Sequence, residues 1–215
     1  MFLKQTQTEL GHISVARRSL RGRRVLGSTL IEVLVALLLL SFTLLGIAGL
    51  MSATTRYQLG VNSRSVITLL FNDLTSRVRS NNASTATAYV YNSTSWSDQQ
   101  AAISAISPLC GATDAVACSP DQRAAYDVWD LRTAVRWALP QGGLLIAGNP
   151  DNGLTMSFLW FDKDIGKDED DPTVLRKSKP CASSMTPVQL QSCCPTAAEV
   201  ESTPGVRCLN FTFIR

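Results

Sequence analysis

Residues 23–40, RRVLGSTLIEVLVALLLL, join a basic segment to a long apolar one. The apolar run continues through residues 33–55 without a charged residue, and a helix needs about 20 apolar residues to cross a bilayer. Arginines gather before this run, so the positive-inside rule predicts that its start faces the cytoplasm. Glu32 lies at the edge of the run, where an ionisable side chain normally has a defined partner.

The basic residues are concentrated at the N-terminus. Of the 20 Lys and Arg and 17 Asp and Glu residues, six basic and one acidic lie in residues 1–27. Residues 28–215 therefore hold 14 basic and 16 acidic side chains, a net charge of −2. This balance argues against a nucleic-acid partner for the folded domain.

The cysteines predict a disulfide framework, because none of them forms a CxxC pair. Disulfides place the C-terminal part of the chain outside the reducing cytoplasm. A bridge between the adjacent Cys193 and Cys194 is strained, so Cys181 and Cys208 are each expected to take one of them, in an order that stays open. The remaining two pair across a short loop. The six cysteines are Cys110, Cys118, Cys181, Cys193, Cys194 and Cys208.

The sequence holds no catalytic constellation. His12 is the only histidine, and its loss with the basic segment would exclude Ser-His-Asp and Cys-His catalysis. We expect no enzyme activity and no cofactor. An acidic stretch at residues 162–171 offers weak calcium ligands, but its spacing does not fit an EF-hand and a solvated loop is favoured, so no metal is expected. The weak candidates are Asp162, Asp164, Asp168 and Asp170.

Apolar periodicity predicts the secondary structure. One helix is expected from about Thr29 to Arg79, with an amphipathic second half that packs on the rest of the chain. Residues 81–107 are predicted as a loop with a short strand near 88–91. A second helix begins after Ser119 and ends at the LPQGG sequence. Strands are predicted at residues 143–148, 154–161 and 206–214. A helix followed by strands with short links gives an α+β domain with an antiparallel sheet.

The stretch G-STLIEVLVALLLLSFTLLGIAGL, which begins at Gly27, resembles the class III signal of type IV prepilins and pseudopilins. The resemblance implies that a prepilin peptidase cuts after Gly27 and that the new amine of Ser28 is methylated. It also implies that Glu32 pairs with the amine of a neighbouring subunit and so sets the register of helices in a filament. Most members of the family have phenylalanine where this chain has Ser28, and the leader is longer than in major pilins.

Three further segments resemble the PilV minor pilins, also called type IV pilus modification proteins: SRSVITLLFNDLTSRVRSNN, AAYDVWDLRTAVRWALPQGG and MSFLWFD. This resemblance implies a type IV pilin fold and a role in the pilus or its priming or tip complex. The implied partners are the prepilin peptidase, other minor and major pilins, and inner-membrane lipid.

The same resemblance implies an organisation in four parts. A cytoplasmic leader (1–27) is cleaved, a membrane and filament-core helix (28–55) continues as an amphipathic helix (56–80), and a periplasmic disulfide-containing domain (81–215) follows. The protein would cross the inner membrane once and later enter the extracellular pilus. The alternatives are a type II secretion pseudopilin, a membrane-anchored periplasmic enzyme, which the missing histidine disfavours, and a DNA-uptake pilin, which would need a local basic patch.

Overall fold

The structure is a computed structural model. It describes residues 29–92, 94–110, 117–163, 170–171, 173–200 and 203–215. The chain divides into two compact units, Met1–Gly49 and Leu50–Arg215. Both units contain part of one long helix, and the second unit contains every strand described below.

Helix α1, Leu30–Ser80, has 51 residues and confirms the predicted single helix within one residue at each end. Among the described residues it is the one helix long and apolar enough to cross a membrane. Its two halves differ in what they bury. The apolar side chains from Leu30 to Met51 are 47–79 % exposed, whereas Ile67, Leu74 and Val78 are completely buried.

The sheet has three antiparallel strands in the order β1-β2-β3: Gly143–Asn149, Gly153–Phe161 and Val206–Phe213. A tight turn closes the β1-β2 hairpin, where Asn149 is the register partner of Gly153. Gly148 and Gly153 have φ angles of 102° and 134°, values that favour glycine because it lacks a Cβ. The mostly apolar β2 is the central strand, and the predicted α+β class is confirmed.

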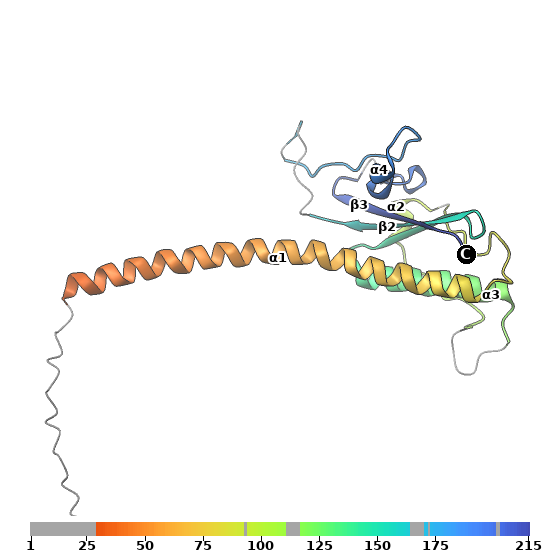
Figure 1. The fold of residues 1–215 in the computed structure, drawn as a ribbon, viewed down its shortest axis with the longest axis horizontal. Coiled ribbons are helices and arrows are strands. Elements are labelled where there is room, and N and C mark those ends of the chain that lie inside the picture. The colour runs from red at the N-terminus through yellow and green to blue at the C-terminus, as the bar shows by residue number, and fades with distance from the viewer. Residues whose placement is uncertain (1–28, 93, 111–116, 164–169, 172, 201–202) are drawn as a thin grey trace, which may run out of the picture. The chain divides into compact units, whose positions relative to one another are not determined.

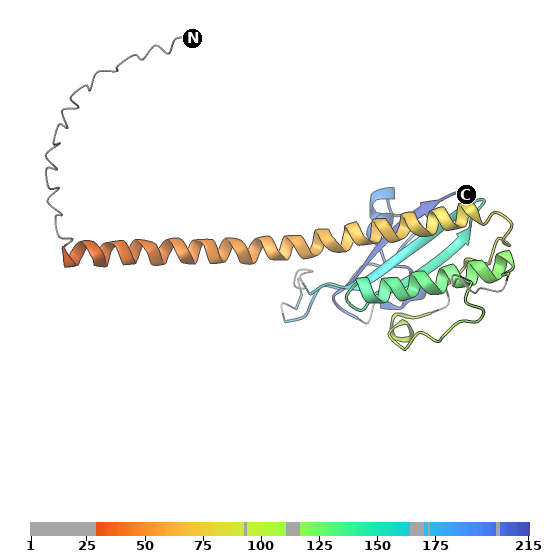
Figure 2. The same ribbon diagram turned by 90° about the horizontal axis from the view of Figure 1, so that it is seen from below.

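Two helices cover one face of the sheet. The second half of α1 and helix α3, Pro120–Ala138, lie side by side on this face, while α4, Pro187–Ser192, lies on the other side (Figures 1 and 2). Side chains alternate between the faces of a strand. In β2, Met156, Phe158 and Trp160 therefore join the core beneath the helices, and Leu159 joins a second, smaller core.

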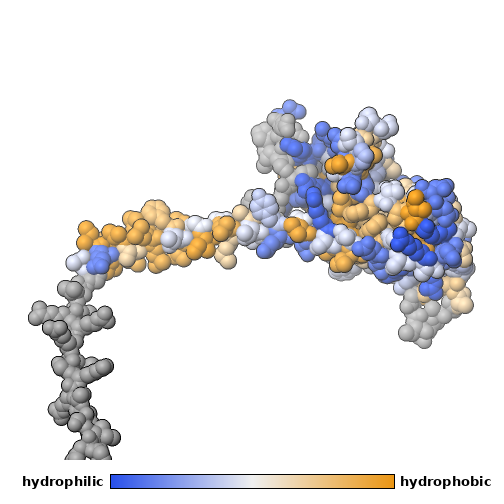
Figure 3. All heavy atoms as spheres, in the orientation of Figure 1, coloured by the Kyte–Doolittle hydropathy of each residue, from blue (hydrophilic) through white to orange (hydrophobic). Residues whose placement is uncertain are grey.

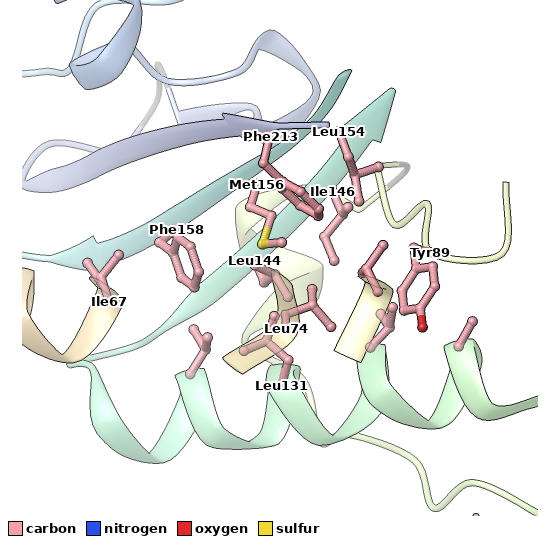
Figure 4. Packing of buried hydrophobic residues seen from close by; sticks show 14 of the residues in the cluster. Ile67, Leu74, Tyr89, Leu131, Leu144, Ile146, Leu154, Met156, Phe158 and Phe213 are labelled. Atoms are coloured by element: carbon pink, nitrogen blue, oxygen red, sulfur yellow. The ribbon is translucent and has the colours of Figure 1, made fainter. Parts of the chain in front are cut away.

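The larger core brings together apolar residues from α1, α3 and all three strands of the sheet. Ile67 and Leu74 from α1, Leu131 from α3 and Phe158 from β2 point toward one another (Figure 4). Phe71 of α1 stacks on Phe211 of β3 with ring centroids 4.8 Å apart. The amphipathic half of α1 is thus part of the domain core, and a long helix packed on an antiparallel sheet is the architecture of the chain.

Helix caps account for the boundaries of α3. The Ser119 hydroxyl accepts from Gln122 N, and the Gln122 side chain accepts from Ser119 N, which makes a capping box. Pro120 occupies the first turn, where its missing N–H costs nothing. The predicted start of this helix is confirmed.

The structure differs from the prediction in the connections. The expected short strand near residues 88–91 is a single bridge between Tyr91 and Ile146. Three short elements were not predicted, because helices of three to six residues carry too little periodicity to detect. They are α2, Trp96–Gln99; α4, Pro187–Ser192; and a 3₁₀ turn, η1, Thr196–Ala198.

All six cysteines are paired, as Cys110–Cys118, Cys181–Cys193 and Cys194–Cys208. The predicted bridge across a short loop and the separate partners of the two adjacent cysteines are confirmed. The structure also shows that Cys181 pairs with Cys193 and Cys208 with Cys194, a choice that the sequence left open. Cys194–Cys208 joins the connection after α4 to β3, and both residues are buried in the smaller core. The two C-terminal bridges therefore fix α4 and its flanking loops against the sheet.

Candidate functional site

The first candidate site is the apolar surface of α1 from Leu30 to Met51. Figure 3 shows this part of the helix covered almost entirely by hydrophobic side chains. Burying exposed apolar area is favourable by about 25 cal/mol per Å², so a helix with this surface requires lipid or other helices around it. An N-terminal helix of this kind is typical of a membrane anchor or a signal sequence.

Two hydroxyls on this surface are satisfied by the backbone of the helix itself. The hydroxyls of Ser41 and Thr43 donate to the carbonyls of Leu38 and Leu40, each at 2.7 Å. Apolar surroundings tolerate hydroxyls only when these have partners. The surface is therefore compatible with lipid or with a helical bundle.

Glu32 lies in the first turn of α1. The unsatisfied N–H groups at a helix start carry partial positive charge, and a carboxylate is favourable there. The side chains beside it, Ile31 and Val33, are 69 % and 47 % exposed. Glu32 is thus an acidic group within an otherwise apolar exposed surface. Gly27 and Ser28 lie outside the described residues, so their predicted processing stays a prediction.

A partly buried polar cluster joins the end of α1 to α3. Arg77 makes ion pairs with Asp73, Asp127 and Asp130 at 2.9, 3.3 and 2.8 Å. Although partial burial opposes its charge, the hydrogen bonds and charge of these carboxylates raise the pKa of Arg77 above its ordinary value. The completely buried Tyr89 donates to Asp127 Oδ2 at 3.2 Å.

Burial governs the titration of this cluster. It raises the pKa of Tyr89 to about 12; the charge of Asp127 adds to the shift, and a hydrogen bond from Asn81 opposes it. Burial also raises the pKa of Asp127, against the opposing effect of its bonds to Arg77 and Tyr89. A perturbed pKa can mark a catalytic group, but here each polar group binds another across two helices and a loop. We interpret the cluster as a structural contact that stabilises the packing of α1, the following loop and α3.

A second candidate site is a hollow at the start of β3, with a volume of about 340 Å³. Five cations from three segments of the chain contribute to its wall, and we call it the basic hollow. Its cations are Arg64 from α1, Arg176, Lys177 and Lys179 from the connection after β2, and Arg207 from β3. None of its lining residues is acidic. The sequence alone does not reveal this site, because the slightly negative net charge of residues 28–215 conceals a local cluster of cations.

The backbone around the basic hollow is held by several independent bonds. Gly205 N donates to the Arg176 carbonyl at 3.2 Å, and Cys194 N donates to the Lys179 carbonyl at 2.9 Å. The Ser178 hydroxyl donates to the carbonyl of Val206. Together with the Cys181–Cys193 bridge, these contacts fix residues 176–179 against β3 at the edge of the sheet.

The acidic stretch that follows β2 is only partly described. Asp162 forms an ion pair with Arg207 at 3.2 Å, and the Asp171 carboxylate accepts from Thr173 N at 2.9 Å. Asp164 and Asp168 lie outside the described residues, whereas Asp170 lies within them. Among the residues that the structure describes, no three His, Cys, Asp or Glu side chains converge to hold a metal ion. The weak calcium candidates therefore stay untested.

Comparisons with protein-family models, with curated proteins and with solved structures find no match for this chain. The architecture itself is pilin-like, since a long N-terminal apolar helix continues into a half that packs on a C-terminal antiparallel sheet. The disulfides are typical of an extracytoplasmic domain.

Proposed function

We propose that the protein is a non-enzymatic minor type IV pilin. In this account the prepilin peptidase removes the leader after Gly27, and the processed subunit waits in the inner membrane with its disulfide domain in the periplasm. It then enters the pilus, or the priming or tip complex that starts it, through packing of its N-terminal helix against those of other pilins.

One observation carries the proposal. The exposed apolar half of α1 begins with an acidic residue, Glu32, five positions after a glycine that follows an arginine-rich segment. In a simple anchor this carboxylate would do no more than stabilise the start of the helix. In a filament it has a further role, because the amine created at Ser28 of one subunit can neutralise Glu32 of the next.

The pair between Glu32 and the amine of Ser28 contributes more to the register of neighbouring helices than to their affinity for one another. Taking two charges out of water offsets most of their mutual attraction. A helix that slips by one turn, however, leaves a buried charge without its partner, which costs about 3–5 kcal/mol. The exposed surface around Glu32 supplies the association, and the charge pair fixes the register.

The proposal is tested by substituting Glu32 with Ala in cells whose other pilins are intact. Cleavage should continue, because the peptidase recognises the glycine, while the amount of this subunit in sheared pili should fall strongly. Ser41→Ala, at a position on the same exposed half of α1, serves as the matched control and should be incorporated normally. Incorporation of the Glu32→Ala subunit at the wild-type level would refute the register role.

A further inference from the structure

We propose that the basic hollow binds a phosphate-bearing organic anion. This goes beyond the proposed function and does not rest on it, because every lining residue belongs to the Leu50–Arg215 unit. A volume of about 340 Å³ is at the lower end of the range of roughly 300–1,000 Å³ that small-molecule sites occupy.

Part of the charge of the hollow is uncompensated. Of its five cations, Arg207 is bound by Asp162 and Arg176 also has an interaction partner, whereas in the described part of the chain no ion pair involves Arg64, Lys177 or Lys179. Gathering like charges destabilises a fold through mutual repulsion. Binding of an anion relieves that repulsion, so the folded site favours an anionic ligand before any specific contact is counted.

The number of cations favours phosphate over a carboxylate. A carboxylate carries one charge on two oxygens, which a single arginine satisfies. A phosphate monoester carries about −1.5 to −2 charge on three acceptor oxygens and suits several donors. The arginine forks supply paired N–H donors, and Lys177 and Lys179 supply point charges on flexible stems.

The hollow is not purely polar, which favours an organic ester over the free ion. Met185 and Leu209 line it beside the cations, and Trp160 forms part of its wall. The aliphatic stems of lysine and arginine add apolar surface of the same kind. A ligand with a charged phosphate and a carbon skeleton matches both parts of this lining.

The hydrogen bonds and the disulfide around residues 176–179 preorganise the site. A ligand that enters a fixed site does not pay for ordering a loop, and preorganisation raises affinity in this way. Two sources supply the required chemistry: a soluble phosphate ester, or the headgroup of an anionic phospholipid.

The test uses the full-length chain in micelles of a neutral detergent. Glycerol 3-phosphate, with glycerol as its uncharged counterpart, is titrated by calorimetry. Phosphatidic acid, whose headgroup is a phosphate monoester, is added to the micelles with phosphatidylcholine as its counterpart, and lipid adducts are counted by native mass spectrometry. Binding of glycerol 3-phosphate shows that a soluble ester is sufficient, and adducts with phosphatidic acid alone identify the lipid headgroup; either result supports the site.

Charge-removing variants locate the binding. Lys177→Gln/Lys179→Gln should weaken it about tenfold or more, since one lost charged contact corresponds to roughly a factor of ten. Arg64→Gln, from a different element, should weaken it as well. The control Arg79→Gln/Arg123→Gln removes two exposed cations outside the hollow and should leave binding unchanged.

Two results would overturn the proposal: no binding of either phosphate compound by the wild-type chain, or equal weakening by the control pair. If single-stranded DNA binds where neither phosphate compound does, the cations are assigned to nucleic acid instead.

Discussion

The buried hydroxyl of Tyr89 gives a prediction with two separate signatures. Phenylalanine at this position keeps the ring in the core but removes the donor to Asp127. A hydrogen bond to a charged group contributes about 1.5–3 kcal/mol, and the carboxylate left behind is buried. At pH 7, Tyr89→Phe should therefore lower the free energy of unfolding by about that amount, measured by urea denaturation of the full chain in detergent.

The second signature appears at alkaline pH. The pKa of Tyr89 is about 12 in the folded state, against about 10 in an unfolded chain. Because the folded pKa is the higher one, the stabilisation is complete below pH 10 and is lost as the pH rises toward 12. The unfolded state gains from ionisation first, so the wild-type free energy of unfolding falls by about 1.3 kcal/mol between pH 9 and pH 11 through this residue.

Tyr89→Phe has no hydroxyl to ionise, so the difference in stability between variant and wild type should narrow by that amount over this pH range. Tyr57→Phe, at a side chain that is 78 % exposed, should retain the full wild-type pH dependence and serves as the control. A Tyr89→Phe variant that loses stability with pH as steeply as the wild type would refute the reasoning.

Three further predictions concern the core, a disulfide and the acidic loop. Leu74→Ala, at a completely buried position, should lower the free energy of unfolding by about 2–5 kcal/mol in urea denaturation. Leu69→Ala, at a side chain that is 69 % exposed, should change it by no more than about 0.5 kcal/mol. Equal losses for the two variants would mean that the buried face of α1 is assigned wrongly. Replacing both Cys194 and Cys208 with Ala should cost about 3 kcal/mol in the same assay, because the bridge closes a loop with a sequence separation of 14; a loss below about 1 kcal/mol would contradict the pairing. Calcium or EDTA should leave the Tm unchanged if residues 162–171 form a solvated loop, and a calcium-dependent rise would favour a secretion pseudopilin.

The elements that the sequence predicts well are those with a repeating pattern and a chemical boundary. The apolar spacing through Ile67 and Leu74 places a face of α1 in the core, and Ser119 with Pro120 places the start of α3. In β3 every second residue from Leu209 to Phe213 is apolar, and this alternation predicts which face of the strand lies beneath the helices. Each of these signals is local, so it can be read without knowing the rest of the fold.

The remainder depends on contacts between distant segments. Ala198 and Val200 enter the smaller core from an irregular connection, where no period marks them. Arg64 and Arg207 meet in the basic hollow, although they are far apart in the sequence and belong to a unit with a slightly negative balance. The Tyr89–Asp127 bond joins a loop to α3, and only the folded chain shows that both groups are buried.

The central claim is that the chain is processed as a prepilin, and the N-terminus of the protein isolated from membranes tests it most directly. Mass spectrometry of the intact chain and of its N-terminal peptide should find a protein that begins at Ser28 and whose N-terminal amine, when methylated, is heavier by the mass of one CH₂ group. A chain that still begins at Met1, or one cut beyond residue 50, would contradict the account.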